Sequence, residues 1–118
     1  MLRDAWNEER AAASAARERH DLAEEWRLLE RAHVLSQPMA GAHVKTHVAM
    51  LGYALRRRDG RELAGQVFRM LVAAPGSWTG RYPAGNTGGS DVSAFRAMPI
   101  PDDLAALLDD AGAQGTKC

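Results

Sequence analysis

Three of the four histidines lie on two neighbouring segments, at spacings that suit a metal ion. His43 and His47 are four residues apart, so on a helix both imidazoles point to one side, one turn from each other. Glu30 and His33, three residues apart on the preceding segment, have the carboxylate and histidine spacing used by helical-bundle metal proteins. If the two segments pack as a hairpin, these side chains converge where ionisable groups are costly to bury without partners. The sequence therefore predicts a site between helices for one metal ion.

The predicted ligands suit a divalent transition metal, which includes zinc, iron, copper, nickel and manganese. The metalloprotease helix would read His-Glu-x-x-His, but Val44 follows His43, so the general base of that chemistry is missing. A dinuclear carboxylate site needs a second Glu-x-x-His pair and further carboxylates. We therefore expect metal handling or sensing without turnover. An enzyme that uses a metal-bound water is a weaker alternative, which requires an open coordination position and a cleft.

A structural polar network is the alternative to a metal site. A histidine on an apolar stripe is often a core residue whose two nitrogens are satisfied by a carbonyl and a side chain. Glu30 would then accept a bond from His33, His43 or the indole of Trp26, and the network would fix how two helices pair. On this interpretation the chain is a tetratricopeptide-like protein–protein interaction module that binds its partner elsewhere.

The apolar periodicity predicts an all-α fold. Asp21 with Glu24, and Asp59 with Glu62, are capping-box pairs that start two of the helices. The expected architecture is a four-helix bundle of two hairpins, tetratricopeptide-like in shape, with a Gly/Pro-rich strap over 75–100 and a short fifth helix. The predicted helices cover about 4–19, 22–36, 41–57, 60–74 and 101–109.

The pattern also assigns faces to the later elements. In the helix over 41–57, an apolar row is expected to point inward with the row of His43 and His47 beside it, and Thr46 is expected on the outer side. That apolar row consists of Val44, Val48, Leu51 and Leu55. The helix over 60–74 is expected to bury Leu63, Val67, Met70 and Leu71. Large apolar residues such as Trp78 and Tyr82 are expected to pack the strap over the bundle.

The two start signals, at positions 21 and 59, lie 38 positions apart. That offset invites a comparison of the two hairpins as copies of one helix-turn-helix unit, although two copies do not establish a repeat. It aligns His33 with Leu71, so the first copy has an imidazole where the second has an apolar residue. It also aligns His47 with Glu9, which makes Glu9 an additional candidate ligand.

The stretch Gly85–Gly89 contains Asn86 and Thr87 as candidate residues of a ligand-binding loop, because successive glycines let backbone amides converge on an anion. The stretch lacks the lysine and the strand-to-helix context of a phosphate-binding P-loop. The alternative is a tight turn in which Asn86 and Thr87 bond to the backbone.

The composition excludes several classes of partner. The 118 residues suffice for one domain over 1–118. Lys and Arg number 15, as do Asp and Glu, so no excess charge favours nucleic acid or a membrane surface. The N-terminus has no secretory signal pattern and no apolar run approaches the roughly 20 residues of a membrane span, so we expect a cytoplasmic protein. The one cysteine, Cys118, excludes a disulfide framework.

The chain resembles a family of small bacterial proteins that is known only as a domain of unknown function. The resemblance covers most of the chain and implies membership of that fold without an assigned activity. It is carried by Trp26–Gln37, His43–His47 with Met50 and Leu51, Arg58-Asp59, Gly65-Gln66, Gly85–Gly89 and Met98–Pro101.

Overall fold

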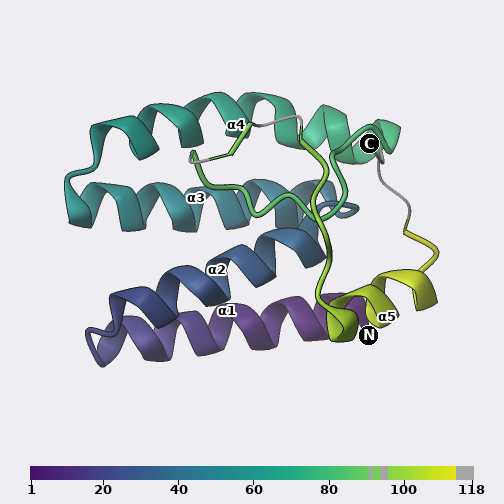
Figure 1. The fold of residues 1–118 in the computed structure, drawn as a ribbon, viewed down its shortest axis with the longest axis horizontal. Coiled ribbons are helices and arrows are strands. Elements are labelled where there is room, and N and C mark those ends of the chain that lie inside the picture. Colours follow the sequence, from purple (N-terminus) through teal and green to yellow (C-terminus); the bar gives the residue numbers. More distant parts are fainter. Residues whose placement is uncertain (91, 94–95, 114–118) are drawn as a thin grey trace.

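The computed structural model describes residues 1–90, 92–93 and 96–113, with the backbone alone for 72–74, so Cys118 lies outside the described residues. Five helices follow one another in this part of the chain: α1 (Leu2–Glu18), α2 (Leu22–Ser36), α3 (Ala40–Arg57), α4 (Gly60–Thr79) and α5 (Asp102–Asp110). Helix α1 packs on α2 and α3 packs on α4, while α2 also contacts α3 and α5 (Figure 1). The predicted all-α fold with two helical hairpins and a short fifth helix is confirmed.

Two aspartates start helices as predicted. The Oδ1 atom of Asp21 accepts a hydrogen bond from the Glu24 amide at 3.2 Å, and that of Asp59 accepts one from the Glu62 amide at 3.0 Å. Each bond satisfies an amide that lacks a partner within the helix. Among the described residues, no helix combines the length and apolar character needed to cross a membrane.

Helix α4 is longer than the sequence predicted. The helix does not stop before Pro75 but continues to Thr79, where Gly80 ends it in the left-handed conformation with φ +70°. Proline removes one backbone hydrogen bond and crowds the preceding turn, which usually breaks a helix. Here the turn after Pro75 is supported by Thr79, whose hydroxyl donates to the Pro75 carbonyl at 2.8 Å. The strap therefore begins at about residue 80, and Ser77 is part of the helix.

The apolar core lies mainly between α1, α2 and their neighbours. One cluster joins α1, α2, α3 and α5 and contains Trp6, Ala32, Val34, Leu35, Ala42, Leu104 and Leu108. A second cluster joins α1 and α2 to α3 and contains Ala13, Ala16, Leu28, Leu29 and Met50. The indole of Trp6 donates to the Thr46 hydroxyl at 2.9 Å, so the prediction that Thr46 faces outward is wrong.

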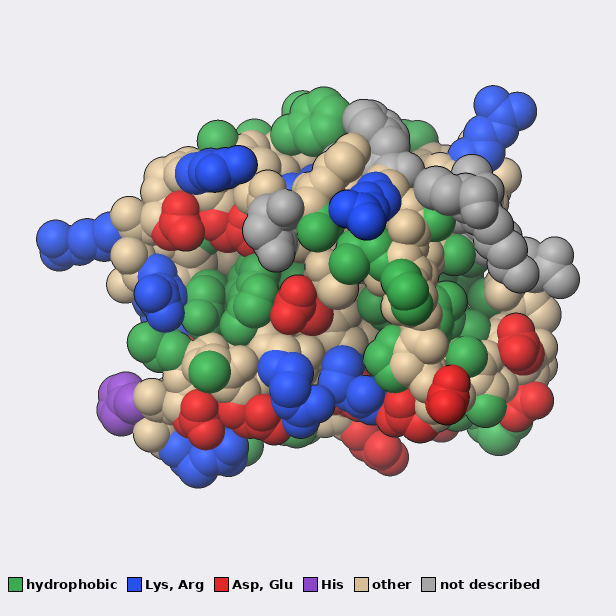
Figure 2. All heavy atoms as spheres, viewed as in Figure 1, with side chains coloured by type: hydrophobic (Ala, Val, Ile, Leu, Met, Phe, Trp, Pro, Cys, Tyr) green, Lys and Arg blue, Asp and Glu red, His purple; other side chains and the backbone are tan. Residues whose placement is uncertain are grey.

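The second hairpin exposes much of its apolar rows, contrary to the prediction, and buries two polar rows, of which the row of His43 and His47 was expected to face inward. Val48 and Leu55 are 49% and 58% exposed, whereas the row of His43 and His47 is buried. On α4 the apolar side chains of Val67, Leu71 and Trp78 are exposed, and Glu62, Gln66, Arg69 and Ser77 are buried. Figure 2 shows apolar side chains at the surface over α4. Rows of polar side chains can be buried without a large loss of stability only when their groups have hydrogen-bond partners. The strap supplies many of these partners.

The strap over residues 80–101 runs from the end of α4 across both hairpins to α5 (Figure 1). Tyr82, within the strap, is buried, as predicted. The side chain of Gln37 fixes the strap to the end of α2, because its amide donates to the Pro83 carbonyl at 2.8 Å and its Oε1 accepts from the Gly85 amide at 3.1 Å. These bonds place Gly85–Gly89 directly over the histidines.

Candidate metal centre

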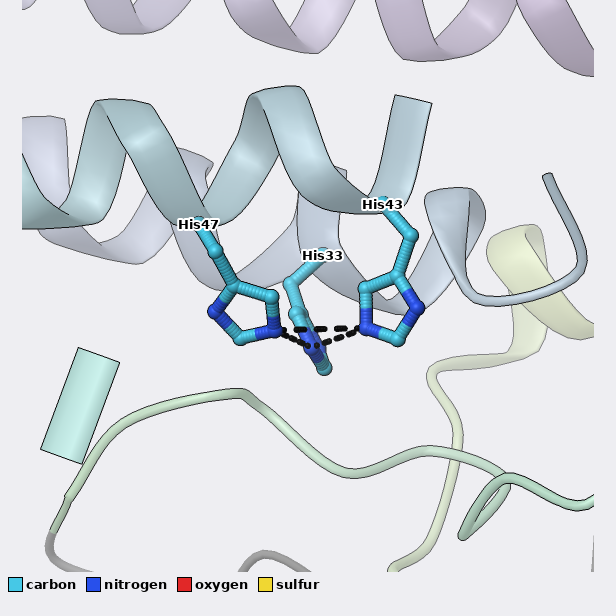
Figure 3. A group of neighbouring side chains, drawn as sticks. All are labelled: His33, His43 and His47. Carbon is cyan, nitrogen blue, oxygen red and sulfur yellow. Dashed lines mark hydrogen bonds between the residues drawn. The ribbon is translucent and has the colours of Figure 1, made fainter. Parts of the chain in front are cut away.

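His33 on α2 meets His43 and His47 on α3 (Figure 3). The three Nε2 atoms form a triangle, with 3.0 Å between His33 and His43, 3.1 Å between His33 and His47, and 3.3 Å between His43 and His47. All three side chains are buried, with exposed fractions of 3%, 6% and 2% in chain order. The convergence predicted from the spacing of these histidines is therefore present, and we call the group the histidine triad.

The partners of the Nδ1 atoms fix two of the three tautomers. The Nδ1 of His33 lies 2.6 Å from the backbone carbonyl of Asn86, which can only accept, so this nitrogen carries the hydrogen. The Nδ1 of His47 lies 2.6 Å from Oε1 of Gln66. The amide of Gln66 is oriented by two acceptors, since its Nε2 donates to the Gly88 carbonyl at 2.7 Å and to Glu62 at 3.3 Å. Oε1 of Gln66 must then accept from His47.

The hydroxyl of Ser77 places the hydrogen of His43 on Nδ1 in the same way. Its Nδ1 lies 2.9 Å from the Ser77 hydroxyl. That hydroxyl uses its single hydrogen to donate to the Gln37 carbonyl, so it accepts from His43. All three histidines thus carry a hydrogen on Nδ1, so in its neutral form each ring presents an unprotonated Nε2 to the centre of the triad.

Burial keeps the rings of His33 and His47 in this neutral form. It lowers the pKa of His33 well below its ordinary value, and the nearby His47 and His43 lower it further. Burial also lowers the pKa of His47 to about 4, although the hydrogen bond to Gln66 acts in the opposite direction. At neutral pH these two imidazoles are uncharged, which is the form that binds a metal ion.

Three unprotonated nitrogens at this separation match the requirement of a metal ion. Bonds of about 2.0 Å in a tetrahedral zinc site place neighbouring nitrogens about 3.3 Å apart. The three Nε2 distances of 3.0, 3.1 and 3.3 Å lie at or just below that value. The histidine triad could therefore hold one ion with little movement of the side chains, and a fourth coordination position would remain for another ligand.

Gly88 allows the strap to lie against the triad. Its φ of +87° lies in the left-handed region, and a Cβ atom there would approach His33 to 2.6 Å at Cδ2 and 3.0 Å at Nε2. Both the conformation and the contact favour glycine. This position therefore keeps the space beside the His33 nitrogen free of protein side chain.

Comparison with known proteins identifies the family. The family model described as "Protein of unknown function (DUF3703)" matches residues 1–108. The chain belongs to this family. No curated protein and no solved structure matches it. The resemblance expected from the sequence is confirmed, and the function of this DUF3703 protein has to be argued from its site.

The two predicted carboxylate ligands lie away from the histidine triad. Among the described residues, the group that could hold a metal contains the three histidines and no carboxylate. Glu30 is half-buried and lines a surface pocket of about 260 Å³ with Thr87 and Pro99. Glu9 forms an ion pair with Arg31 at 2.9 Å. Side chains three residues apart lie about 60° apart around a helix, so His33 can face the triad while Glu30 faces the surface pocket.

The predicted loop residues have different surroundings. Asn86 holds a turn, because its Oδ1 accepts from the Gly88 amide at 2.9 Å and its Nδ2 donates to the carbonyls of Ser93 and Arg96. This is the arrangement of the tight-turn alternative. The Thr87 hydroxyl is buried and has no hydrogen-bond partner among the described residues.

Sequence reasoning missed the residues that orient the triad. Gln66 and Ser77 lie on the buried face of α4, with Glu62 and Arg69 between or beside them in a polar row of helical period. This periodic polar row was a usable signal, but the apolar row next to it on the same helix obscured it. Ser77 was also assigned to the strap because Pro75 precedes it.

Proposed function

We propose that this DUF3703 protein binds one transition-metal ion through His33, His43 and His47, in metal handling or sensing without turnover, in the cytoplasm. The observation that carries the proposal is the triangle of unprotonated Nε2 atoms, each held in place by a hydrogen bond at Nδ1. The carboxylates expected from the sequence, Glu30 and Glu9, are not needed for this ligand set.

A purely structural network explains the triad less well. In a network, each buried donor faces an acceptor. Here the Nδ1 hydrogens already have acceptors, and the three Nε2 atoms are acceptors that face one another within 3.3 Å. Such an arrangement is unfavourable without a cation at its centre, because the lone pairs of neighbouring Nε2 atoms repel one another.

Metal analysis of the purified protein tests the proposal. After incubation with zinc, copper, iron, nickel or manganese and removal of excess ion, the wild-type chain should retain one equivalent of at least one metal, measured by mass spectrometry of the elements. His47→Ala should retain none while circular dichroism shows unchanged helix content. His20→Ala is the matched control, because His20 is the exposed fourth histidine.

Two outcomes would contradict the proposal: a wild-type protein that retains none of these ions, or a His47→Ala variant that still retains a full equivalent. If His47→Ala loses helix content, His43→Gln serves in its place, since a glutamine side chain fills more of the site than an alanine side chain does.

A second candidate function is the tetratricopeptide-like interaction module. The observation in its favour is the exposed apolar surface of the second hairpin, which contains Val48, Leu55, Val67, Leu71 and Trp78. Exposed apolar patches of this kind often mark protein interfaces. Under this function the triad has only a structural role, so removal of metal should leave the thermal stability unchanged.

A further inference from the structure

The histidine triad offers an ion no negative charge. An imidazole that binds a metal through Nε2 carries no negative charge, and each Nδ1 hydrogen bonds to an uncharged oxygen: a backbone carbonyl for His33, a hydroxyl for His43 and a carboxamide for His47. Metal-binding histidines elsewhere often donate to a carboxylate, which makes the ligand more basic. In the described network the nearest carboxylate is that of Glu62, which contacts the triad only through Gln66 at 3.3 Å.

Because the site is buried, the absence of negative charge among its ligands affects which ion it can bind. The triad side chains are at most 6% exposed. The cost of transferring an ion from water into a medium of low dielectric grows with the square of its charge, so a dication costs about four times as much as a monocation of similar size. The site expected from the sequence for a divalent ion included one carboxylate, that of Glu30. Without a carboxylate in the triad, this transfer cost favours binding of a monovalent ion over a divalent ion.

The nature of the ligand atoms then selects among monovalent ions. Hard cations prefer oxygen ligands, and the triad presents nitrogen. Imidazole nitrogens are good copper ligands, and among the first-row transition metals copper is the one that is stable in proteins as a monovalent ion. Resting on the proposed metal site, we propose that the histidine triad selects copper as Cu(I) over Cu(II) and other dications.

A comparison of the two copper ions in the same protein tests the role of charge directly. Cu(I) is titrated without oxygen against a colorimetric Cu(I) chelator, and Cu(II) against a competing amino-acid chelator. The wild-type chain should bind one Cu(I) with a Kd about 100-fold or more below that for Cu(II), because transfer of the dication from water into a buried, uncharged site costs more free energy. Zn(II), titrated in the same way, should also bind more weakly than Cu(I).

Gln66→Glu is the matched variant, because it places a carboxylate at the same position against the Nδ1 of His47. The added charge should favour the dication, so the ratio of the Cu(II) and Cu(I) dissociation constants should fall about tenfold. Wild-type titrations remain decisive if this variant does not fold, since they need no substitution.

The outcomes separate this inference from the proposed function. Wild-type binding of Cu(II) or Zn(II) as tight as that of Cu(I) would overturn the selection of Cu(I) but leave a metal site in place. An unchanged ratio in a folded Gln66→Glu variant would overturn the electrostatic explanation. Failure of every ion to bind would instead overturn the proposed function itself.

Discussion

The hydrogen on Nδ1 decides the chemistry of each histidine in the triad. Asn86, Ser77 and Gln66 supply three different kinds of oxygen, yet all three act as acceptors. A partner that donates to Nδ1 would favour the tautomer with its hydrogen on Nε2, and that hydrogen would prevent this nitrogen from binding a metal. The residues around the triad therefore do more than fill space, because they set which nitrogen is available.

The same burial predicts acid lability of the metal-free protein. Unfolded histidine has a pKa of about 6.5, whereas the pKa of His47 in the fold is about 4, so between these values the unfolded chain binds more protons. The free energy of unfolding should be constant above about pH 7 and fall as the pH decreases toward 4, by up to about 1.4 kcal/mol per pH unit for each such histidine. Urea unfolding at a series of pH values measures this.

His47→Gln is the control for the pH series, since it removes one titrating ring and should make the decline less steep. A metal-free wild type whose stability stays level or rises between pH 6.5 and 4 would contradict the lowered pKa of the buried rings.

Among the site residues, those predictable from the sequence were the ones that follow helical spacing. The four-residue spacing of His43 and His47 fixes their relation within one helix. His33 required only that two adjacent helices pack together. Gln66 and Ser77 could not be assigned to the triad, because their contacts depend on how α4 is rotated against α3, and the apolar row of α4 suggested the wrong rotation.

At the scale of elements, helix starts were predictable and helix ends were less so. The aspartate caps are local signals, and both function as expected. The end of α4 depends on contacts beyond its own sequence, which outweigh the tendency of Pro75 to stop a helix. The apolar rows of α3 and α4 were wrongly predicted to face inward, because apolar periodicity identifies a row of like residues but not the surface that the strap will cover.

Gly88 allows the strap to pack against the triad, so replacing it should affect metal binding. Gly88→Ala should weaken metal binding at least about tenfold, because the added methyl group meets the His33 ring and a left-handed alanine is strained. Isothermal titration with the bound ion measures the change.

Gly80→Ala is the matched control for Gly88→Ala. Gly80 also has positive φ, at +70°, but nothing lies within 4 Å of its added Cβ. This variant should lose stability through backbone strain alone and keep the wild-type metal affinity. Equal losses of affinity in the two variants would show that strain in the strap, and not the contact with His33, is responsible.

At the scale of the whole molecule, the triad is one of the links between the two hairpins. The others include the packing of Met50 against the first hairpin and the ion pair of Glu25 with Arg56, whose oxygen and nitrogen are 2.5 Å apart. A metal ion bound to His33 and to both histidines of α3 would add a link that is absent from the unfolded chain.

The thermal stability of the whole chain should therefore depend on metal. An ion that binds only the native state stabilises it by about 2.7 kcal/mol when its free concentration is 100 times its Kd. For a domain of this size, that should raise the Tm by about 10 °C. Scanning calorimetry of the loaded protein, before and after chelation, measures the difference.

In His47→Ala the same chelation should leave the Tm unchanged. If chelation also leaves the loaded wild-type Tm unchanged while removing a full equivalent of metal, the ion is bound outside the native triad.

The order of the strap in the chain has a consequence for biosynthesis. His33, His43 and His47 emerge from the ribosome before the carbonyl of Asn86 and the residue that closes over them, Gly88. A nascent polypeptide has all three imidazoles but not the support that aligns the first of them. If the triad binds an ion as proposed, we expect binding in the final geometry only after translation has passed the strap and the chain extends through Gly88.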